Sequence, residues 1–119
     1  MDQQAFVRGL AGSAIASGVV AVVSPGSLQR AYGAESSPAT RGVTRLWGSG
    51  TVVLGNLGLR ARGEALDELL LLLGAMNTVD AISTAVSAVR EEDGRRPALM
   101  TAASSALFAG LTFYSRTLR

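Results

Sequence analysis

The chain of 119 residues contains no cysteine and no histidine. Without cysteine it can form no disulfide, no thiolate nucleophile and no cysteine-based metal site. Without histidine it lacks the commonest metal ligand and the commonest general base, which excludes Ser–His and Cys–His catalytic arrangements. Charged residues are also few, at 17% of the chain. We therefore predict no metal and no cofactor, and we favour a non-enzymatic role over an enzymatic one.

Lysine is absent as well, so all eleven basic residues are arginines, and the formal net charge is +2. A protein that binds nucleic acid gathers its basic side chains on one face or strip. Here acidic residues accompany the arginines, as in the segment Arg90–Arg96, where three acids interrupt the basic residues. This distribution argues against nucleic acid as a partner.

The charges fall in four clusters, which long uncharged stretches separate: 30–45, 60–68, 90–96 and 116–119. This pattern is typical of membrane spans joined by short polar loops. The sequence therefore predicts an all-α fold, a four-helix transmembrane bundle whose antiparallel helices run up-down-up-down as one domain. The expected helices cover about 5–23, 38–59, 64–90 and 97–117.

Prolines and caps set the helix limits. Ser24 and Pro25 end the first helix. Ser37 is an N-cap, and Pro38 follows it in the first turn of the second helix. Pro97 suits the first turn of the fourth helix for the same reason, after a polar loop at 90–96.

Small residues recur at every fourth position of the first helix, at Gly9, Ser13, Ser17 and Ala21. Residues at this spacing share one stripe of a helix. In lipid such a stripe lets a neighbouring helix approach closely. We therefore expect it to form a helix interface, and we expect a homo-oligomer.

Residues Gly9–Val23 also fit the apolar region of a signal peptide, with Ala31 and Gly33 as the small residues before a cleavage site. The leading segment does not favour this alternative, because Asp2 cancels the charge of Arg8. The arginines divide five and six between the two sides of the bundle. The positive-inside rule therefore gives no orientation.

The second helix is the shortest candidate span. Its uncharged part, Leu46–Leu59, would be only about 21 Å long at helical rise, whereas the hydrocarbon of a bilayer is about 30 Å thick. If this helix crosses the membrane, Arg45 must lie inside it. The short span also leaves a soluble helical bundle open as an alternative.

Asp80 interrupts the apolar stretch Leu69–Val89 near its middle. An ionisable group at the bilayer centre costs about 2.5–3.5 kcal/mol on insertion scales, so it should face the bundle interior and have a partner. Asp80 lies about 17 Å beyond Leu69, and Arg45 lies about 21 Å before Leu59. A guanidinium spans the difference of roughly 4 Å. We therefore predict that Arg45 and Asp80 pair across adjacent helices.

Other polar side chains accompany these two charges. Asn77 and Thr84 lie on the Asp80 face of the third helix. On the second helix Ser49 lies four residues after Arg45, and Trp47 adds an indole donor. The predicted buried network or ligand-binding set is Arg45, Asp80, Asn77, Ser49, Trp47 and Thr84. Its role stays open between a structural clamp and a lining for a ligand or proton path.

Four segments carry a resemblance to a known family: Ser24-Pro25, Leu28–Gly33, Thr44–Gly48 and Asn77–Ala81. In this order they resemble a bacterial domain-of-unknown-function family of small four-helix membrane proteins, distantly similar to the DoxX-like group. The resemblance implies a four-helix membrane fold, gives weight to Arg45 and Asp80, and implies no activity. In that family a further Arg-Asp pair often follows the glycine matching Gly48, whereas this chain has Gly50 and Thr51 there.

Together these patterns predict a multi-pass protein of the cell membrane that acts as an accessory or interaction subunit. Its expected partners are the lipid bilayer and either further copies of the chain or a larger membrane protein complex. The principal alternative is a membrane-embedded site for a quinone-like, lipidic or anionic small molecule around Arg45 and Asp80.

Overall fold

The computed structural model describes residues 2–90 and 95–118, and every regular element in these ranges is a helix. This confirms the all-α class. The helices are α1 (Gln3–Val23), α2 (Pro25–Ala31), α3 (Pro38–Arg60), α4 (Gly63–Arg90) and α5 (Arg95–Arg116). They number five within the described ranges, where four were expected. Most of the predicted loop at 90–96, including its three acids, lies outside the described residues.

The additional helix α2 lies between the first two predicted helices, where only a connection was expected. Ser24 does end α1, as expected, but Pro25 starts a new helix immediately. A proline suits that position because its fixed φ matches a helix and no partner is needed for a backbone N–H. The start of α3 is confirmed in detail, since Ser37 and Thr40 form a reciprocal capping box.

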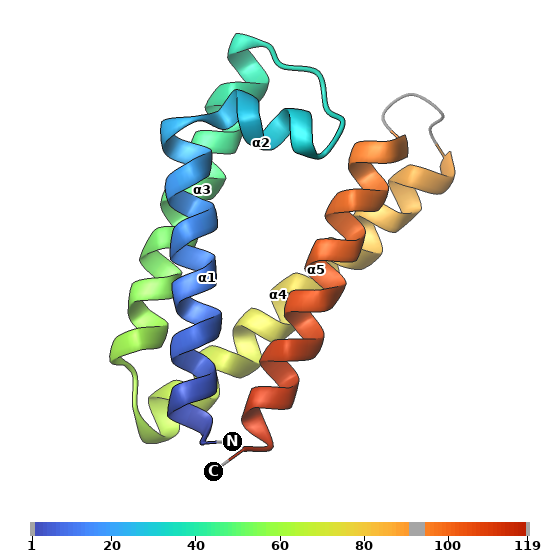
Figure 1. The fold of residues 1–119 in the computed structure, drawn as a ribbon. Coiled ribbons are helices and arrows are strands. Elements are labelled where there is room, and N and C mark those ends of the chain that lie inside the picture. The colour runs from blue at the N-terminus through green and yellow to red at the C-terminus, as the bar shows by residue number, and fades with distance from the viewer. Residues whose placement is uncertain (1, 91–94, 119) are drawn as a thin grey trace.

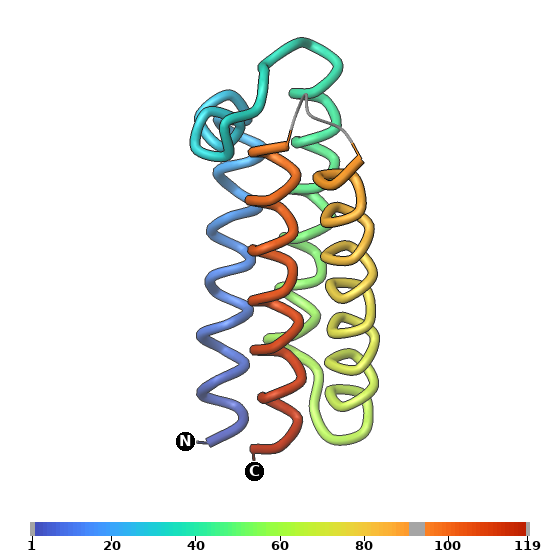
Figure 2. The backbone as a smooth tube through the Cα atoms, turned by 90° about the vertical axis from the view of Figure 1, so that its right-hand side faces the viewer, coloured from blue at the N-terminus to red at the C-terminus, as the bar shows by residue number. Residues whose placement is uncertain are grey.

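The long helices form two antiparallel pairs, α1 with α3 and α4 with α5 (Figure 1). Both termini lie at the end of the molecule where α3 turns into α4 (Figures 1 and 2). From that end, which we call the joint, the two pairs diverge, and α2 lies across the far end of the α1/α3 pair (Figure 1).

The α1/α3 pair is held by close backbone contact. A Cβ added at Gly48 would lie 2.7 Å from the Gly18 carbonyl oxygen and 2.8 Å from the Ala21 Cβ. A Cβ added at Gly55 would lie 2.6 Å from a side-chain carbon of Ile15. Within the chain this seam contains only part of the predicted stripe. Ala21 belongs to the seam, but the other buried small residues of α1 are Ala11 and Gly18, while Gly9 and Ser13 are exposed.

At the joint, side chains of both pairs form a small apolar cluster. Val7 of α1 packs with Leu66 and Leu70 of α4, and Ala61, just beyond α3, packs against them. Further along the α4/α5 seam, Gly74 gives room to a phenylalanine ring of α5. The pairs therefore meet mainly at one end.

A second link joins the pairs at the far end. The hydroxyl groups of Tyr32, just after α2, and Ser104 of α5 lie 2.8 Å apart and share a hydrogen bond. Gly33, which has a positive φ of 74°, lies against the side chain of Arg96. Within the α1/α3 half, the buried Gln29 of α2 donates to the hydroxyl of Thr44 of α3 over 3.1 Å.

Most large apolar side chains point outward from the single chain. In the described residues 21 of them are exposed, whereas only Val7, Leu66 and Leu70 are buried. Three helices, α1, α4 and α5, are long and apolar enough to cross a membrane; α3 is not among them.

Candidate functional site

Arg45 lies on an exposed position of α3, four turns before that helix ends. Its Nε donates to the main-chain oxygen of Val22, over 3.4 Å. Val22 lies in the last turn of α1, where the carbonyl groups have no partner within the helix. A guanidinium also complements the negative end of the helix dipole. Arg45 therefore has a structural role at the end of α1.

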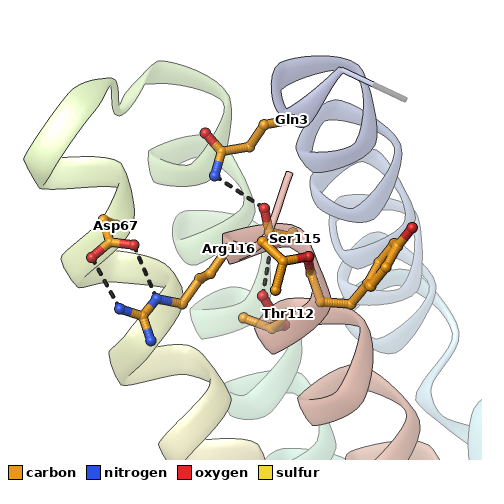
Figure 3. Close-up of polar contacts among 7 residues, drawn as sticks. Gln3, Asp67, Thr112, Ser115 and Arg116 are labelled. Carbon is orange, nitrogen blue, oxygen red and sulfur yellow. Dashed lines mark hydrogen bonds and ion pairs between the residues drawn. The ribbon is translucent and has the colours of Figure 1, made fainter. Parts of the chain in front are cut away.

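Asp80 is exposed on α4, and no ion pair or hydrogen bond reaches its carboxylate from the described residues. The ion pair that those residues do form joins Arg116 of α5 to Asp67 of α4 (Figure 3). Its two N–O distances are 3.0 and 3.1 Å, and both side chains are partly exposed. The expected pairing of Arg45 with Asp80 within one chain is thus not formed.

Helix rotation explains why the pairing fails although the depths match. Successive residues turn by about 100° around a helix. Leu66, which contacts the other pair at the joint, precedes Asp80 by 14 residues, close to four full turns. Asp80 therefore lies on the same side of α4 as Leu66, where it is exposed.

The same counting places Trp47, rather than Arg45, on the side of α3 that contacts the other pair at the joint. Ala61 contacts the other pair at the joint and follows Trp47 by 14 residues, again about four turns. Arg45 precedes Trp47 by two residues and lies about 200° around α3, on the outer side. Trp47 and Asp80 each lie about 21 Å from the joint at helical rise.

Neither Trp47 nor Asp80 is covered by the opposite helix pair. Trp47 is 50% exposed and Asp80 is exposed, whereas Leu66 and Ala61, on the same sides at the joint, pack together. A side chain that the opposite pair covered would be buried. Trp47 and Asp80 are therefore not covered by the opposite pair, and the two pairs diverge from the joint (Figure 1).

The remaining predicted site residues bond to their own helices. Asn77 donates to the Leu73 carbonyl oxygen, and Thr84 donates to the main-chain oxygen of Asp80, not to its carboxylate. Ser49 donates to the main-chain oxygen of Arg45. Asn77 and Thr84 are half-buried beside Asp80, while Ser49 lies with Arg45 on the outer side of α3. The predicted set thus divides into two groups.

A polar cluster lies at the joint that the sequence did not predict. Gln3 donates from Nε2 to the Ser115 carbonyl oxygen over 3.0 Å, and the fully buried Ser115 hydroxyl donates to the Thr112 carbonyl oxygen over 2.6 Å (Figure 3). These are uncharged residues with no spacing motif, so no sequence signal marked them. The Asp67–Arg116 pair had a weak signal, because both residues lie in charge clusters at the same end of antiparallel helices.

In residues 2–90 and 95–118, no three acidic side chains come close enough to share a metal ion. No family model, no curated protein and no solved structure matches the chain. The resemblance to the DoxX-like group stays a prediction.

Proposed function

We propose that this chain is a multi-pass membrane protein whose four long helices cross the bilayer, and that it acts as an accessory or interaction subunit. The exposed apolar surface carries this proposal. A water-soluble monomer rarely exposes large contiguous apolar patches, whereas here the large apolar side chains outside greatly outnumber those inside. In hydrocarbon the same surface is solvated.

The bonding of polar side chains supports a membrane position for α3 as well. In lipid every polar group needs an internal partner. Eight side chains of α1, α3 and α4 donate to the carbonyl oxygen four residues earlier: Ser17, Thr44, Ser49, Thr51, Asn56, Asn77, Thr78 and Thr84. Four of these lie on α3, which spans about 35 Å at helical rise, long enough for the bilayer.

The competing view is a soluble helical bundle. Washing membranes with alkaline carbonate separates the two, because it strips peripheral proteins and leaves spanning ones in place. We expect the chain to stay in the membrane pellet. Release into the supernatant would contradict the membrane proposal.

The outer side of α3 supports the interaction role. Arg45, Ser49 and Asn56 are exposed there and lie along one stripe. Polar stripes of this kind bind helices in membranes through hydrogen bonds, and lipid chains offer no such partner. We therefore propose that another helix, from a second copy or a larger complex, covers this stripe.

Photo-crosslinking tests this part of the proposal. The absence of cysteine allows a benzophenone to be attached at a single introduced thiol. We expect Ser49→Cys and Asn56→Cys to yield a protein adduct, of doubled mass if the partner is a second copy. Leu72→Cys, on the exposed apolar side of α4, should react only with lipid. Lipid adducts alone at positions 49 and 56 would contradict the interaction role.

A further inference from the structure

Two opposite charges lie at similar heights on different helix pairs, and both are exposed. Arg45 of α3 lies about 24 Å from the joint at helical rise, and Asp80 of α4 lies about 21 Å from it. Neither side chain is covered within its own chain. In residues 2–90 and 95–118 no ion pair includes either of them. Charged groups at membrane depth pair with one another, so each of these two needs a partner of opposite sign.

The contact that Arg45 makes within its chain leaves most of its guanidinium available. Its Nε donates to the Val22 main-chain oxygen over 3.4 Å. A guanidinium carries five N–H donors, and within the described residues Arg45 uses one of them. A main-chain oxygen carries no full negative charge. The two terminal nitrogens of Arg45 therefore remain available for a carboxylate, which arginine binds through two parallel hydrogen bonds.

The other charged side chains lie at different heights. Every other arginine of the described residues lies within two turns of a helix end or in a connection. Arg41, one turn further from the joint than Arg45, is about 9 Å from the height of Asp80. Asp80 is likewise the one acid of the described residues that lies deep within a long helix. When copies enter the bilayer in the same orientation, the arginine of a second copy that matches the depth of Asp80 is therefore Arg45.

The neighbours of both charges suit a contact between helices in lipid. Arg45 shares its exposed stripe with Ser49 and Asn56. On α4, Ser83 and Ser87 are exposed, and they follow Asp80 by three and seven residues, which places them on the same side of that helix. Small and polar side chains let helices approach closely in membranes and form hydrogen bonds between them. Each stripe thus offers polar partners that lipid chains do not provide.

We propose that two copies of this chain associate in the membrane through a salt bridge between Arg45 of one copy and Asp80 of the other. The inference rests on the proposed membrane location, and it deepens the proposed interaction role, since it names α4 of a second copy as the partner of the α3 stripe. The contact joins two different surfaces of the chain. A two-fold dimer therefore forms the salt bridge twice, and a ring of copies forms it once at each contact.

The test is a charge swap between two full-length copies that carry different tags and are expressed together. Unmodified copies should co-purify from mild detergent. Arg45→Asp should weaken self-association by at least about tenfold, and so should Asp80→Arg, because each change brings like charges together. A copy with Arg45→Asp and a copy with Asp80→Arg should associate with one another, because opposite charges then meet again. A misfolded chain would not be rescued in this way.

Neutral variants and a matched control complete the test. Arg45→Gln and Asp80→Asn should each weaken association, since each leaves the other charge without its partner. Asp67→Asn, an acid of the same helix whose partner lies in the same chain, should co-purify as the unmodified chain does. Unchanged association in either neutral variant would contradict the proposal. So would unmodified copies that do not co-purify, or swapped copies that keep their helices by circular dichroism and still do not associate.

The earlier experiments keep this inference apart from the proposals on which it rests. If the photo-adduct at Ser49→Cys joins the chain to a different protein and copies do not co-purify, the interaction role stands and the pairing of two copies is refuted. Lipid adducts alone refute the interaction role. A chain released by carbonate refutes the membrane location, whatever it associates with.

Discussion

The two helix pairs have the same antiparallel geometry but are held together differently. In α1/α3 the backbones touch, because Gly18 and Gly48 face one another and leave no room for a Cβ. In α4/α5 side chains fill the seam. Gly74 accepts the ring of Phe113, whose ring carbons would lie 2.7 Å from an added Cβ, and an ion pair spans the end.

The two seams should differ in how well they tolerate an added side-chain atom. A backbone carbonyl in van der Waals contact cannot move without moving its helix, whereas a partly exposed ring rotates. Without a hydrophobic driving force between helices in lipid, close packing and hydrogen bonds hold the pairs. The glycine seam should therefore fail first when it is disturbed, and the side-chain seam should adapt.

The largest effect is expected at Gly48. Gly48→Ala places a methyl group 2.7 Å from the Gly18 carbonyl oxygen, which must push α1 and α3 apart. Overpacking of this kind costs about 1–3 kcal/mol, and Gly48→Leu should cost more. Reversible unfolding by SDS in mixed micelles, followed by circular dichroism, measures the change.

Gly50→Ala is the matched control on the same helix, since nothing lies within 4 Å of its added Cβ. We expect it to be neutral or slightly stabilising, because alanine favours a helix by about 0.5–1 kcal/mol over glycine. Equal losses of stability in the Gly48 and Gly50 variants would contradict the claim that the α1/α3 seam has no room for a side chain at Gly48.

A smaller effect is expected at Gly74. Its added methyl group meets the ring of Phe113, which is 37% exposed and has room to turn outward. Gly74→Ala should therefore destabilise the chain by less than Gly48→Ala in the same SDS titration. The double variant Gly74→Ala/Phe113→Leu should recover most of the loss, and Gly110→Ala, in open space, is the control. A Gly74→Ala loss larger than that at Gly48 would reverse the proposed order of tolerance.

The link between the pairs at the far end should contribute less again. Tyr32→Phe removes the hydrogen bond to Ser104, a net loss of about 0.5–1.5 kcal/mol. Tyr114→Phe serves as control, because it keeps the ring that packs edge-on against Phe6. The SDS titration measures this loss as well. A loss in Tyr32→Phe no larger than that in Tyr114→Phe would show that this hydrogen bond does not help to hold the pairs together.

The smallest effect is expected at the ion pair. Asp67 and Arg116 are partly exposed, and exposed pairs contribute little because water and salt screen them. Asp67→Asn and Arg116→Gln should each lower the thermal midpoint only slightly, and the double variant should lose no more than either single one. Added salt should reduce even this difference. A large, salt-independent loss would show that the pair is part of the core.

Sequence reasoning succeeded where a pattern acts locally. The long uncharged stretches between charge clusters predicted the long helices, and the serine–proline signal predicted the start of α3, which the capping box confirms. The helix α2 was missed because a breaker at Ser24 and Pro25 also fits the start of a new helix. Local chemistry did not distinguish a connection from a short helix.

The site could not be predicted in the same way, because it depends on which helices are neighbours. Depth along a helix follows from counting residues, and it placed Arg45 and Asp80 at similar heights. Rotation about the helix axis depends on the packing partner, and α3 packs on α1 rather than on α4. That choice placed Arg45 beside the end of α1, where its guanidinium contacts the Val22 oxygen. The packing partner likewise determines which small residues of α1 lie in the seam, namely Ala11, Gly18 and Ala21.

The central claim is that the outward apolar surface of these helices lies in hydrocarbon. Spin labels at single introduced cysteines test it most directly, with Val79→Cys on the exposed side of α4 and Ser36→Cys in the connection before α3. The account predicts that oxygen, which dissolves in lipid, reaches the label at position 79 readily while a water-soluble nickel chelate does not, and that the reverse holds at position 36. Nickel access at position 79 equal to that at position 36 would contradict it.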